Sequence, residues 1–351
     1  MPASALDVKP QATAERQEFY GRLLKKSATP LWEVFSDIVT VTPKPVGVPV
    51  MWRYEELRPL LMESGSLISA AEAERRVLIL ENPALPGQSQ VTGTLYAGLQ
   101  LVLPGEVAPS HRHTPSALRF VLESEGGYTA VDGERITMHP GDFIVTPSWN
   151  YHDHGNDSNA PIIWLDVLDL PMINAMAVGF AEHHPQETQP LTRPEGDSLA
   201  RYGSGLFPVD FVPQPGHSPV RVYPYDRSRA SLIESASYIP PHRCHGVKMR
   251  YENPATGGFA MSTIGTFLQL LPKGFSGAPY RSTDATVYCI KEGRGKSKVG
   301  DQVFEWGPND IFVVPSWTPV SHAASAQAIL FSASDRPVQQ MLRLWREEEI
   351  D

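Results

Sequence analysis

Histidine is concentrated in one stretch of the chain. Five of the eleven histidines lie between Gly105 and Asn156. His111 and His113 are two residues apart, and side chains at i and i+2 of a β-strand project from the same face, so both imidazoles can reach one point. His152 follows an apolar run that ends at a Pro-Ser-Trp turn, and it is the candidate for a third imidazole. The spacing predicts a three-histidine site for a borderline divalent metal.

The residues around these histidines are typical of short strands and tight turns. Imidazoles that point into one barrel from two antiparallel strands would hold a metal and leave coordination positions open for a substrate. His139 lies in a turn before a strand, and we expect it to be an ordinary surface residue. His154 is two residues past His152 and could also face the metal, although it is the weaker candidate for a ligand.

Two segments resemble the sequence motifs of the cupin family. They are Gly105, five residues and His111-x-His113, and Gly141, five residues, Pro147, His152, three residues and Asn156. The chain departs from the usual cupin pattern where a glutamate ligand commonly follows the histidine pair, because it has Ala117, Leu118 and then Arg119 there. The resemblance therefore implies a site of three neutral histidines without a carboxylate.

A more particular resemblance, to the gentisate 1,2-dioxygenase family, covers nearly the whole chain. It is carried by Tyr96-Ala-Gly-Leu-Gln100, His111-Arg-His113, Ser116-Ala-Leu-Arg119-Phe, Pro147-Ser-Trp149, His152-Asp-His154-Gly-Asn156 and Trp164-Leu-Asp166. This resemblance implies an all-β bicupin with one Fe(II) per chain on His111, His113 and His152. It also implies that O2 opens the ring of gentisate (2,5-dihydroxybenzoate), between the carboxyl-bearing carbon and the adjacent hydroxyl-bearing carbon, to give maleylpyruvate.

An acidic substrate needs cations in its site, and two arginines are candidates. A lone Arg75 before a buried strand is ordinarily a solvated edge residue, but the resemblance makes it a substrate-binding arginine. Arg119 lies six residues past His113 in an apolar segment, so strand alternation places it on the ligand face. The planar guanidinium suits a carboxylate partner. The alternative for Arg119 is a buried structural salt bridge.

The resemblance also implies the remaining site residues. Tyr96, Gly98 and Gln100 would line the substrate pocket, and His154 would hydrogen bond to the substrate or to oxygen. Asp166 follows an apolar strand and could orient a histidine or accept a proton, whereas the alternative is a surface carboxylate at a strand end. Together with Arg119, His154 and Asp166 are the expected catalytic residues.

Bulk properties restrict the partners of the protein. The chain has 351 residues, 41% of them hydrophobic, and a formal net charge of −9, which disfavours nucleic acid or an anionic membrane surface. Cys244 and Cys289 are the two cysteines, so no disulfide framework is indicated and a reducing compartment is expected. We expect a cytoplasmic protein, because no signal peptide and no membrane-spanning run is found.

An internal repeat predicts two jelly-roll barrels. Glu252-Asn-Pro-Ala255 repeats Glu81-Asn-Pro-Ala84, and Val313-Val-Pro-Ser-Trp317 repeats Ile144-Val-Thr-Pro-Ser-Trp149. Aligning the two copies gives the correspondences Tyr280 with His111, Ser282 with His113, Tyr288 with Arg119, Val320 with His152 and His322 with His154. The second barrel should therefore be structural and bind no metal. We also expect no metal at the His242, Cys244 and His245 cluster.

The domain organisation follows from the repeat. Residues 1–70 are expected to form an N-terminal helical arm, with helical periodicity from Thr13 to about Lys26 and an apolar face that continues after Pro30. Residues 71–185 should form the metal-binding barrel, 186–225 a linker, and 226–351 the second barrel with a terminal helix over Val338 to Trp345. The resemblance implies a homo-oligomer in which the arm covers a subunit contact, with a tetramer favoured.

Alternatives remain open at this stage. Salicylate or 1-hydroxy-2-naphthoate could be the substrate of the same metal and arginines, and Tyr96, Gly98, Gln100 and Val167 would decide between them. Val167 and Ser124 replace residues that are more often glycine in the family, so they bear on the shape of the pocket. A cupin without catalytic activity that binds metal or ligand is the alternative from another class, although storage needs neither the arginines nor Asp166.

Overall fold

The computed structural model describes residues 12–213 and 216–350. The chain divides into two compact units, residues 1–44 and 45–351. The first unit contains the predicted helices α1 (Ala14–Leu24) and α2 (Leu31–Ile38). Within this unit Trp32 Nε1 donates to Tyr20 Oη at 2.9 Å, and Arg16 pairs with Glu33 at 3.2 Å, so the two helices contact each other through polar side chains.

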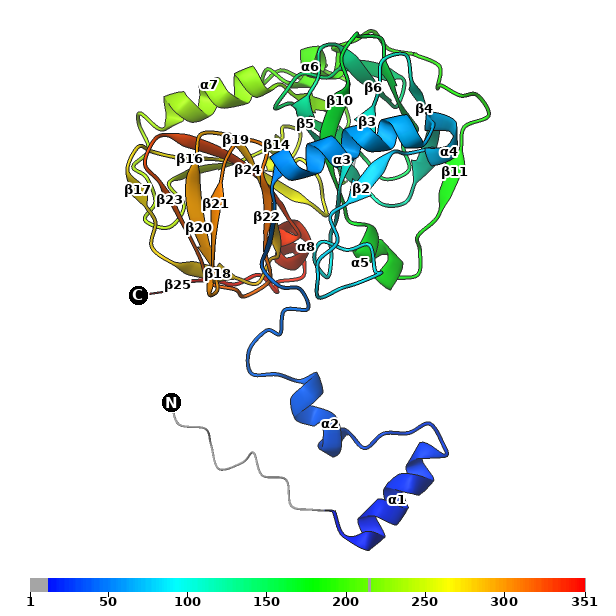
Figure 1. The fold of residues 1–351 in the computed structure, drawn as a ribbon, viewed down its shortest axis with the longest axis vertical. Helices are drawn as coiled ribbons and strands as arrows, with labels where there is room; N and C mark the ends of the chain where they lie inside the picture. The colour runs from blue at the N-terminus through cyan, green and yellow to red at the C-terminus, as the bar shows by residue number, and fades with distance from the viewer. Residues whose placement is uncertain (1–11, 214–215, 351) are drawn as a thin grey trace. The chain divides into compact units, whose positions relative to one another are not determined.

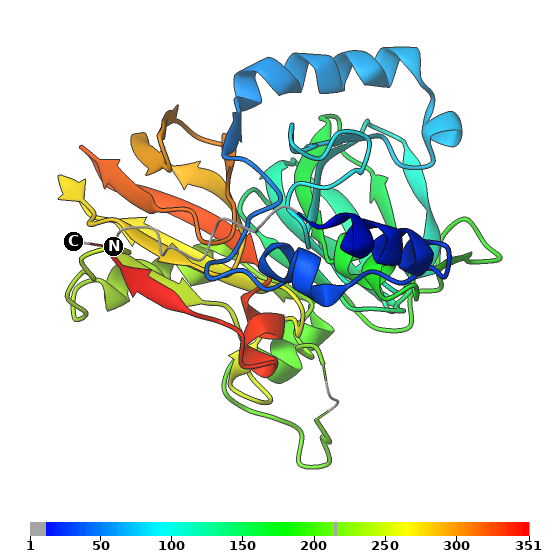
Figure 2. The same cartoon turned by 90° about the horizontal axis from the view of Figure 1, so that it is seen from below.

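The second unit contains two antiparallel β-barrels, drawn side by side in Figures 1 and 2. Barrel 1 consists of a sheet in the order β12-β8-β5-β10-β3-β2 and a facing sheet in the order β11-β4-β9-β6-β7. Its strands are β2 (Val77–Ile79), β3 (Tyr96–Val102), β4 (Val107–His113), β5 (Ala117–Glu123), β6 (Gly127–Val131), β7 (Glu134–Thr137), β8 (Phe143–Thr146), β9 (His152–Asn156), β10 (Ile162–Leu168), β11 (Ala181–His183) and β12 (Val222–Tyr223).

Barrel 2 repeats this plan, so the predicted all-β bicupin is confirmed. Its sheets have the orders β1-β22-β19-β24-β16-β13 and β21-β20-β23-β18-β25, with β17 paired to β23 and a separate β14-β15 hairpin. Its strands are β1 (Val50–Trp52), β13 (Val247–Arg250), β14 (Glu252–Asn253), β15 (Gly258–Phe259), β16 (Gly265–Leu271), β17 (Phe275–Ser276), β18 (Tyr280–Ser282), β19 (Thr286–Glu292), β20 (Gly295–Val299), β21 (Gln302–Trp306), β22 (Ile311–Val314), β23 (Val320–Ala324), β24 (Ala328–Ser334) and β25 (Glu347–Glu349).

The two barrels exchange their first elements. Strand β1 precedes barrel 1 in the chain but pairs with β22 of barrel 2, whereas β12 precedes barrel 2 but pairs with β8 of barrel 1. The helices that follow them, α3 (Tyr54–Leu67) and α7 (Tyr225–Ser235), are held reciprocally. Tyr54 N donates to Asp310 Oδ1 at 2.8 Å, and Tyr225 N donates to Asp142 Oδ1 at 2.9 Å. This exchange ties the barrels together through backbone pairing.

The main hydrophobic core lies between the barrels. Every second residue of the barrel 1 sheet that contains β5 faces the barrel 2 sheet that contains β24. Phe120 of barrel 1 stacks on Phe331 of barrel 2 with ring centroids 4.1 Å apart. Both rings are fully buried, so truncation of either to alanine should cost about 3–5 kcal/mol. The opposite faces of these sheets point into the two barrels, where separate clusters fill the space around the sites.

Four shorter helices complete the second unit, and the last one corrects an expectation. They are α4 (Ala70–Ala73), α5 (Leu170–Ala175), α6 (Asp197–Tyr202) and α8 (Arg336–Met341). The predicted terminal helix is present but starts earlier and ends before Trp345. The chain takes a left-handed conformation at Arg343, with φ 60°, and then forms β25 against β18. The boundaries predicted at residues 70, 185 and 225 stay predictions.

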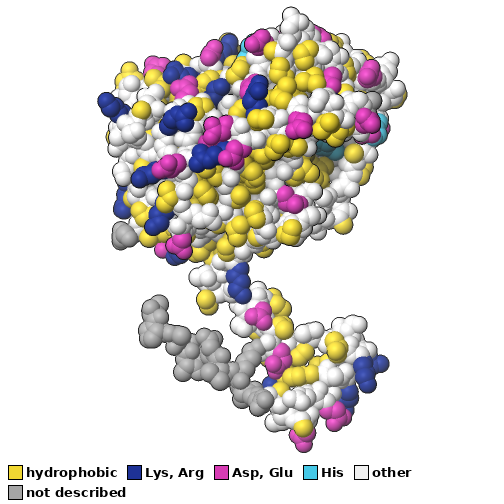
Figure 3. All heavy atoms as spheres, in the orientation of Figure 1, with side chains coloured by type: hydrophobic (Ala, Val, Ile, Leu, Met, Phe, Trp, Pro, Cys, Tyr) yellow, Lys and Arg dark blue, Asp and Glu magenta, His cyan; other side chains and the backbone are white. Residues whose placement is uncertain are grey.

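None of the described helices is long and apolar enough to cross a membrane. Lys and Arg side chains are interspersed with Asp and Glu over the face shown in Figure 3. Cys244 and Cys289 are both free and buried.

Candidate metal and substrate site

Three histidines meet inside barrel 1, on two neighbouring strands. His111 and His113 lie on β4, and His111 is paired directly with His152, the first residue of β9. One ligand atom from each imidazole lies within 4.8 Å of the other two, and the ring centroids of His111 and His152 are 4.3 Å apart. The structure thus brings together the three residues that the sequence singled out as metal ligands.

A strained turn delivers His152 to this place. Trp149 has a left-handed backbone, with φ 63°, and its amide donates to the His113 carbonyl at 2.9 Å. Such a conformation is uncommon for a bulky residue and persists because its surroundings fix it. Trp317 has the same conformation in barrel 2, with φ 58°. The repeated Pro-Ser-Trp sequence is therefore a turn that connects two strands at the mouth of each barrel.

Backbone carbonyls fix the tautomers of two of the imidazoles. His113 Nδ1 lies 2.7 Å from the Pro115 carbonyl, and His152 Nδ1 lies 3.0 Å from the Asn150 carbonyl. A carbonyl only accepts, so each of these Nδ1 atoms carries the proton and each Nε2 keeps its lone pair. His111 Nδ1 lies 3.4 Å from the Pro109 carbonyl but also contacts Arg75 Nη2, so its contacts do not select one tautomer. Three neutral imidazoles are a donor set that fits a divalent metal such as Fe(II), Mn(II) or Zn(II).

The environment keeps these imidazoles neutral. Burial, with the nearby Arg75 cation, lowers the pKa of His111 to about 2. Burial also lowers the pKa of His113, and burial together with the charge of Arg119 lowers the pKa of His152 well below its usual range. A metal ligand must be unprotonated, so the three groups can bind a cation at neutral pH without releasing protons.

Arg119 and Asp166 form a buried pair beside the histidines. They are directly paired across β5 and β10, and Asp166 is also paired with Gly98 of β3, so the three residues form one row inside the barrel. Arg119 Nε lies 3.8 Å from Asp166 Oδ1, which is too far for a hydrogen bond. This Nε is buried and has no hydrogen-bond partner among the described residues. Arg119 therefore has a donor to spare inside the site.

The other donors of Arg119 hold it in place. One Nη2 proton faces His154 Nε2 at 3.3 Å, and Nη1 donates to Thr146 Oγ1. Because a guanidinium only donates, His154 Nε2 accepts and its buried Nδ1 carries the proton, unpartnered among the described residues. His154 thus lies next to the metal triad and offers an N–H into the site.

Asp166 is not the surface carboxylate that was considered as the alternative. It is 6% exposed and accepts from Trp164 Nε1 at 2.9 Å. Burial raises its pKa to about 6, although the charge of Arg119 opposes that rise. No hydrogen bond joins it to a histidine within the described ranges, so it does not orient a ligand directly. Its raised pKa instead suits a group that takes up and releases a proton near neutral pH.

Arg75 lies beside His111. Its Nη2 contacts both the Pro109 carbonyl and His111 Nδ1, and Nη1 donates to the Glu74 carbonyl at 2.9 Å. Burial and the charge of Arg119 lower its pKa to about 10, so it remains a cation. Arg75 is thus a half-buried residue of the site and not a solvated edge residue, whereas the adjacent Arg76 pairs with Glu106 at 2.7 Å.

Strand β3 supplies the remaining wall. Tyr96, Gly98 and Gln100 alternate on its inner face, since Gly98 is paired with Asp166 and Gln100 with Trp164. A Cβ at Gly98 would lie 2.5 Å from Val77 Cγ1 and 2.9 Å from Tyr96 Oη, so glycine is required there by close approach. The side-chain nitrogen of Gln100 is buried without a partner in the described structure.

Two expectations about the pocket are corrected. Val167 does not line it, because it is fully buried in the core between the barrels and points away from the adjacent Asp166. Ser124 lies in the turn after β5, at the opposite end of the strand from Ala117, where its Oγ accepts from the Gly126 amide at 3.3 Å. Neither residue therefore shapes the site directly.

Two residues that hold the site in place were not predicted from the sequence, whereas one histidine was correctly predicted to lie on the surface. Thr146 and Trp164 fix the guanidinium and the carboxylate, and the signal for Thr146 was a hydroxyl on the inner face of an apolar strand. His139 is exposed, with 71% of its side chain accessible.

Barrel 2 has lost the triad. Tyr280 is paired with Val320, just as His111 is paired with His152, so the correspondences predicted from the repeat hold in the strand register.

A second group of possible ligand atoms comes from His242, Cys244 and Glu349, and these atoms lie within 4.8 Å of one another. The Glu349 carboxylate already pairs with His242 at 3.3 Å and with Arg243 at 3.2 Å. That this loop binds no metal stays a prediction.

Two joined jelly-roll barrels, one of them with a three-histidine centre of the kind that can hold a metal, define a bicupin, and residues 98–168 match the family model described as Cupin domain. Gentisate 1,2 dioxygenase 1 of Aquipseudomonas alcaligenes is 55% identical over 97% of this chain and 98% of its own length. The 5-aminosalicylate 1,2-dioxygenase of a Comamonas species is 36% identical over 93% of this chain and 88% of its own. The chain belongs to the gentisate 1,2-dioxygenase family.

A solved structure agrees with this assignment. Salicylate 1,2-dioxygenase of Pseudoaminobacter salicylatoxidans, crystallised as adducts with gentisate, superposes with a TM-score of 0.90. It is 33% identical, and the match covers 98% of this chain and 96% of that one.

Proposed function

We propose that this protein cleaves the ring of gentisate with O2, between the carboxyl-bearing carbon and the adjacent hydroxyl-bearing carbon, to give maleylpyruvate. The observation that carries the proposal is the arrangement of a neutral three-histidine centre beside a buried arginine with an unused donor, in a chain of this family. Storage of a metal would need neither Arg119 nor the carboxylate paired with it.

We propose Fe(II), one per chain, on His111, His113 and His152. When bound, this metal would supply the redox chemistry that lets O2 react with an electron-rich ring without an external reductant. The three imidazoles are an acceptable donor set for several divalent ions, so metal availability selects among them.

The residues around the triad would bind and orient the acid. Arg119 Nε is a free buried donor, and Arg75 is a second cation beside His111, so a substrate carboxylate can accept charge-assisted hydrogen bonds there. The two cations also offset the cost of moving an anion out of water. Gly98 lets Val77 and Tyr96 Oη pack closely against β3 at the wall of the site.

The protons of the substrate hydroxyls would be handled by His154 and Asp166. The unpartnered Nδ1–H of His154 can donate to an oxygen in the site, and its Nε2 is held by Arg119. Asp166, with its pKa raised to about 6, is ionised at neutral pH yet basic enough to accept a proton. Trp164 and Arg119 hold this carboxylate in place throughout.

The substrate assignment is tested by offering gentisate and salicylate separately to the Fe(II)-loaded protein with ¹⁸O2. We expect ring opening of gentisate with both labelled atoms in the product. Salicylate lacks the 5-hydroxyl that enriches the ring in electrons, and we expect it to react more slowly. Faster turnover of salicylate or of 1-hydroxy-2-naphthoate would reassign the substrate within the family, and reaction with none of the three would overturn the proposal.

We further propose that the protein is a cytoplasmic homo-oligomer, with a tetramer favoured. Helix α2 presents Leu31, Trp32, Phe35 and Ile38 to solvent, each more than 50% exposed, and Figure 3 shows apolar side chains on this part of the chain. Such a row of apolar residues marks a surface that is covered in an assembly. Sedimentation of the full chain should give a species heavier than 38.7 kDa, and Trp32→Ser with Phe35→Ser should lower its mass.

A further inference from the structure

Barrel 2 keeps a polar cluster at the place that corresponds to the barrel 1 site. In barrel 2, Ser332 of β24 is paired with Tyr288 of β19 on one side and with Phe267 of β16 on the other. These three residues take the positions that Asp166, Arg119 and Gly98 have in barrel 1. Gln269 lies two residues past Phe267, as Gln100 lies two past Gly98. The second barrel lacks the metal ligands, and its interior combines an apolar cluster with buried polar side chains.

A lysine amine enters this cluster. Lys248 is paired directly with Gln269 across β13 and β16. Its Nζ lies 4.7 Å from the ring centroid of Phe267 and 5.6 Å from that of Tyr288, the two residues that flank Ser332 in the sheet. This amine makes no hydrogen bond and no ion pair with any residue in the described part of the chain.

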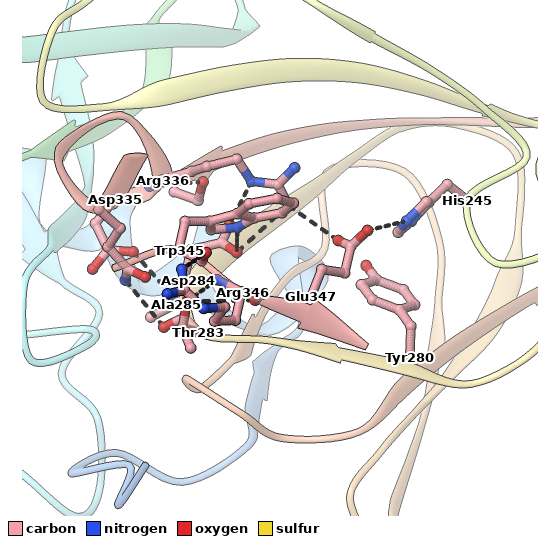
Figure 4. A network of polar contacts seen from close by, with 12 residues as sticks. His245, Tyr280, Thr283, Asp284, Ala285, Asp335, Arg336, Trp345, Arg346 and Glu347 are labelled. Carbon is pink, nitrogen blue, oxygen red and sulfur yellow. Dashed lines mark hydrogen bonds and ion pairs between the residues drawn. The ribbon is translucent and has the colours of Figure 1, made fainter. Parts of the chain in front are cut away.

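The carboxylates of Asp284 and Glu347, whose charges act on Lys248, are paired with Arg336. Arg336 Nε lies 3.1 Å from Asp284 Oδ2, and Arg336 Nη2 lies 3.6 Å from Glu347 Oε2. Glu347 also contacts His245 Nε2 at 3.3 Å, and Figure 4 shows Arg336 and His245 on either side of this carboxylate. Burial, together with the charge of Arg336, lowers the pKa of Lys248 to about 7. The Lys248 amine therefore has no carboxylate of its own among the described residues.

His322 provides a second donor. Its Nδ1 lies 2.8 Å from Ser297 Oγ, and Trp306 Nε1 donates to the same Oγ at 2.9 Å. The Ser297 hydroxyl is fully buried and has no other acceptor for its proton among the described residues, so we assign it as the donor to His322 Nδ1. The proton of neutral His322 is therefore on Nε2, which is buried and unpartnered within the described structure. The His322 ring is 5.1 Å from the Tyr288 ring that Lys248 also approaches.

Other polar atoms in the cluster are also unsatisfied. Ser332 Oγ and Gln269 Oε1 are buried without a hydrogen-bond partner among the described residues. Each such atom lowers the stability of the barrel if nothing binds it. A barrel kept only for packing would gain stability from apolar replacements at these positions, so the pattern points to an occupant that is polar and anionic.

We propose that barrel 2 binds a small aliphatic carboxylate, of the size of formate or acetate, between the Lys248 amine, the Nε2–H of His322 and the Ser332 hydroxyl. The ligand is small because the Phe267 ring occupies the interior position that corresponds to Gly98, a residue without a side chain, in barrel 1. The Gln269 amide oxygen, on the residue paired with Lys248, is available to the protonated amine. This second site does not depend on the reaction of barrel 1.

Binding of radiolabelled acetate to the full Fe(II)-loaded chain, measured by equilibrium dialysis, tests the proposal. The background is Arg119→Met, which weakens acetate binding at the barrel 1 site. We expect one acetate fewer per chain, or an affinity at least tenfold lower, when Lys248→Met is added to this background. Lys296→Met, which removes an exposed lysine from β20, should leave binding unchanged. Unlabelled formate should compete, whereas chloride at equal ionic strength should not.

Several outcomes would overturn the proposal. They are no saturable acetate binding in the Arg119→Met protein, equal binding with and without Lys248→Met, and competition by chloride as strong as by formate. His322→Phe is a second variant that removes a different donor and should weaken acetate binding independently. Thermal unfolding of each variant shows whether it is folded, so that loss of binding is not confused with loss of structure.

Discussion

Arg119→Met is the most informative single change, because it separates substrate binding from metal binding. The variant removes a buried cation with one unused donor but leaves the three imidazoles and the carbonyls that fix their tautomers in place. Removing one partner of a buried charged pair between protein and ligand costs about 3–5 kcal/mol of binding, which corresponds to roughly a 10²- to 5 × 10³-fold lower kcat/KM. If the carboxylate is held equally in the ground and transition states, the loss falls mainly on KM.

Two further readouts sharpen this prediction. Iron content should stay near one per chain. Loss of the Arg119 charge raises the pKa of His152 toward its usual range, but burial still lowers this pKa, so His152 stays unprotonated and able to bind iron. The pKa of Asp166 should rise above about 6, because the charge of Arg119 opposes its elevation. The acidic limb of the kcat profile should therefore move to higher pH.

A matched control is available in the same barrel. Arg135 on β7 makes an exposed ion pair with Asp157 at 2.8 Å, and Arg135→Met should leave KM and iron content close to the wild-type values. Steady-state O2 uptake at varied gentisate, together with iron analysis of the same samples, makes the comparison. An Arg119→Met protein that loses iron but keeps its KM would refute the role of this residue in binding the acid.

Three more predictions concern other parts of the site. Asp166→Asn should lower kcat by about 10²- to 10⁴-fold and abolish the fall in kcat below pH about 6, because only the carboxylate form can accept a proton; an unchanged pH profile would remove Asp166 from proton transfer. Gly98→Ala should lower kcat/KM by up to roughly 10²-fold, because the new Cβ would lie 2.5 Å from Val77 Cγ1. The control is Gly21→Ala, whose Cβ would meet no atom within 4 Å and which should leave steady-state rates unchanged. His113→Ala should bind less than one iron per chain and lose the rise in Tm that Fe(II) gives the wild type, and equal metal contents would disprove its role as a ligand.

The sequence predicted those parts of the site that depend on local geometry. The spacing of His111 and His113 follows from strand alternation, and the repeat aligned Tyr280 with His111 and Val320 with His152, as the strand registers show. The same alternation could have corrected Val167, because a residue next to Asp166 on a strand must point to the other face.

Other features arise from long-range packing that no local pattern encodes. Strands β1 and β12 have three and two residues, too few for a periodic signal, so their exchange between the barrels was not predicted. The pairing of Arg119 with Asp166 depends on which strands become neighbours, and the isolation of Lys248 depends on Arg336 taking the nearby carboxylates. The terminal helix was predicted too far along the chain, because no sequence signal indicates the left-handed backbone at Arg343, just after the end of the helix.

We propose that His111, His113 and His152 of barrel 1 hold the metal at which gentisate and O2 react. The most direct measurement is O2 uptake by anaerobically Fe(II)-loaded protein with gentisate, recorded together with product absorbance, for the wild type and for His152→Ala. We expect one O2 consumed per gentisate opened by the wild type, and neither uptake nor bound iron in the variant. Full turnover by His152→Ala, or no uptake by the iron-loaded wild type, would contradict it.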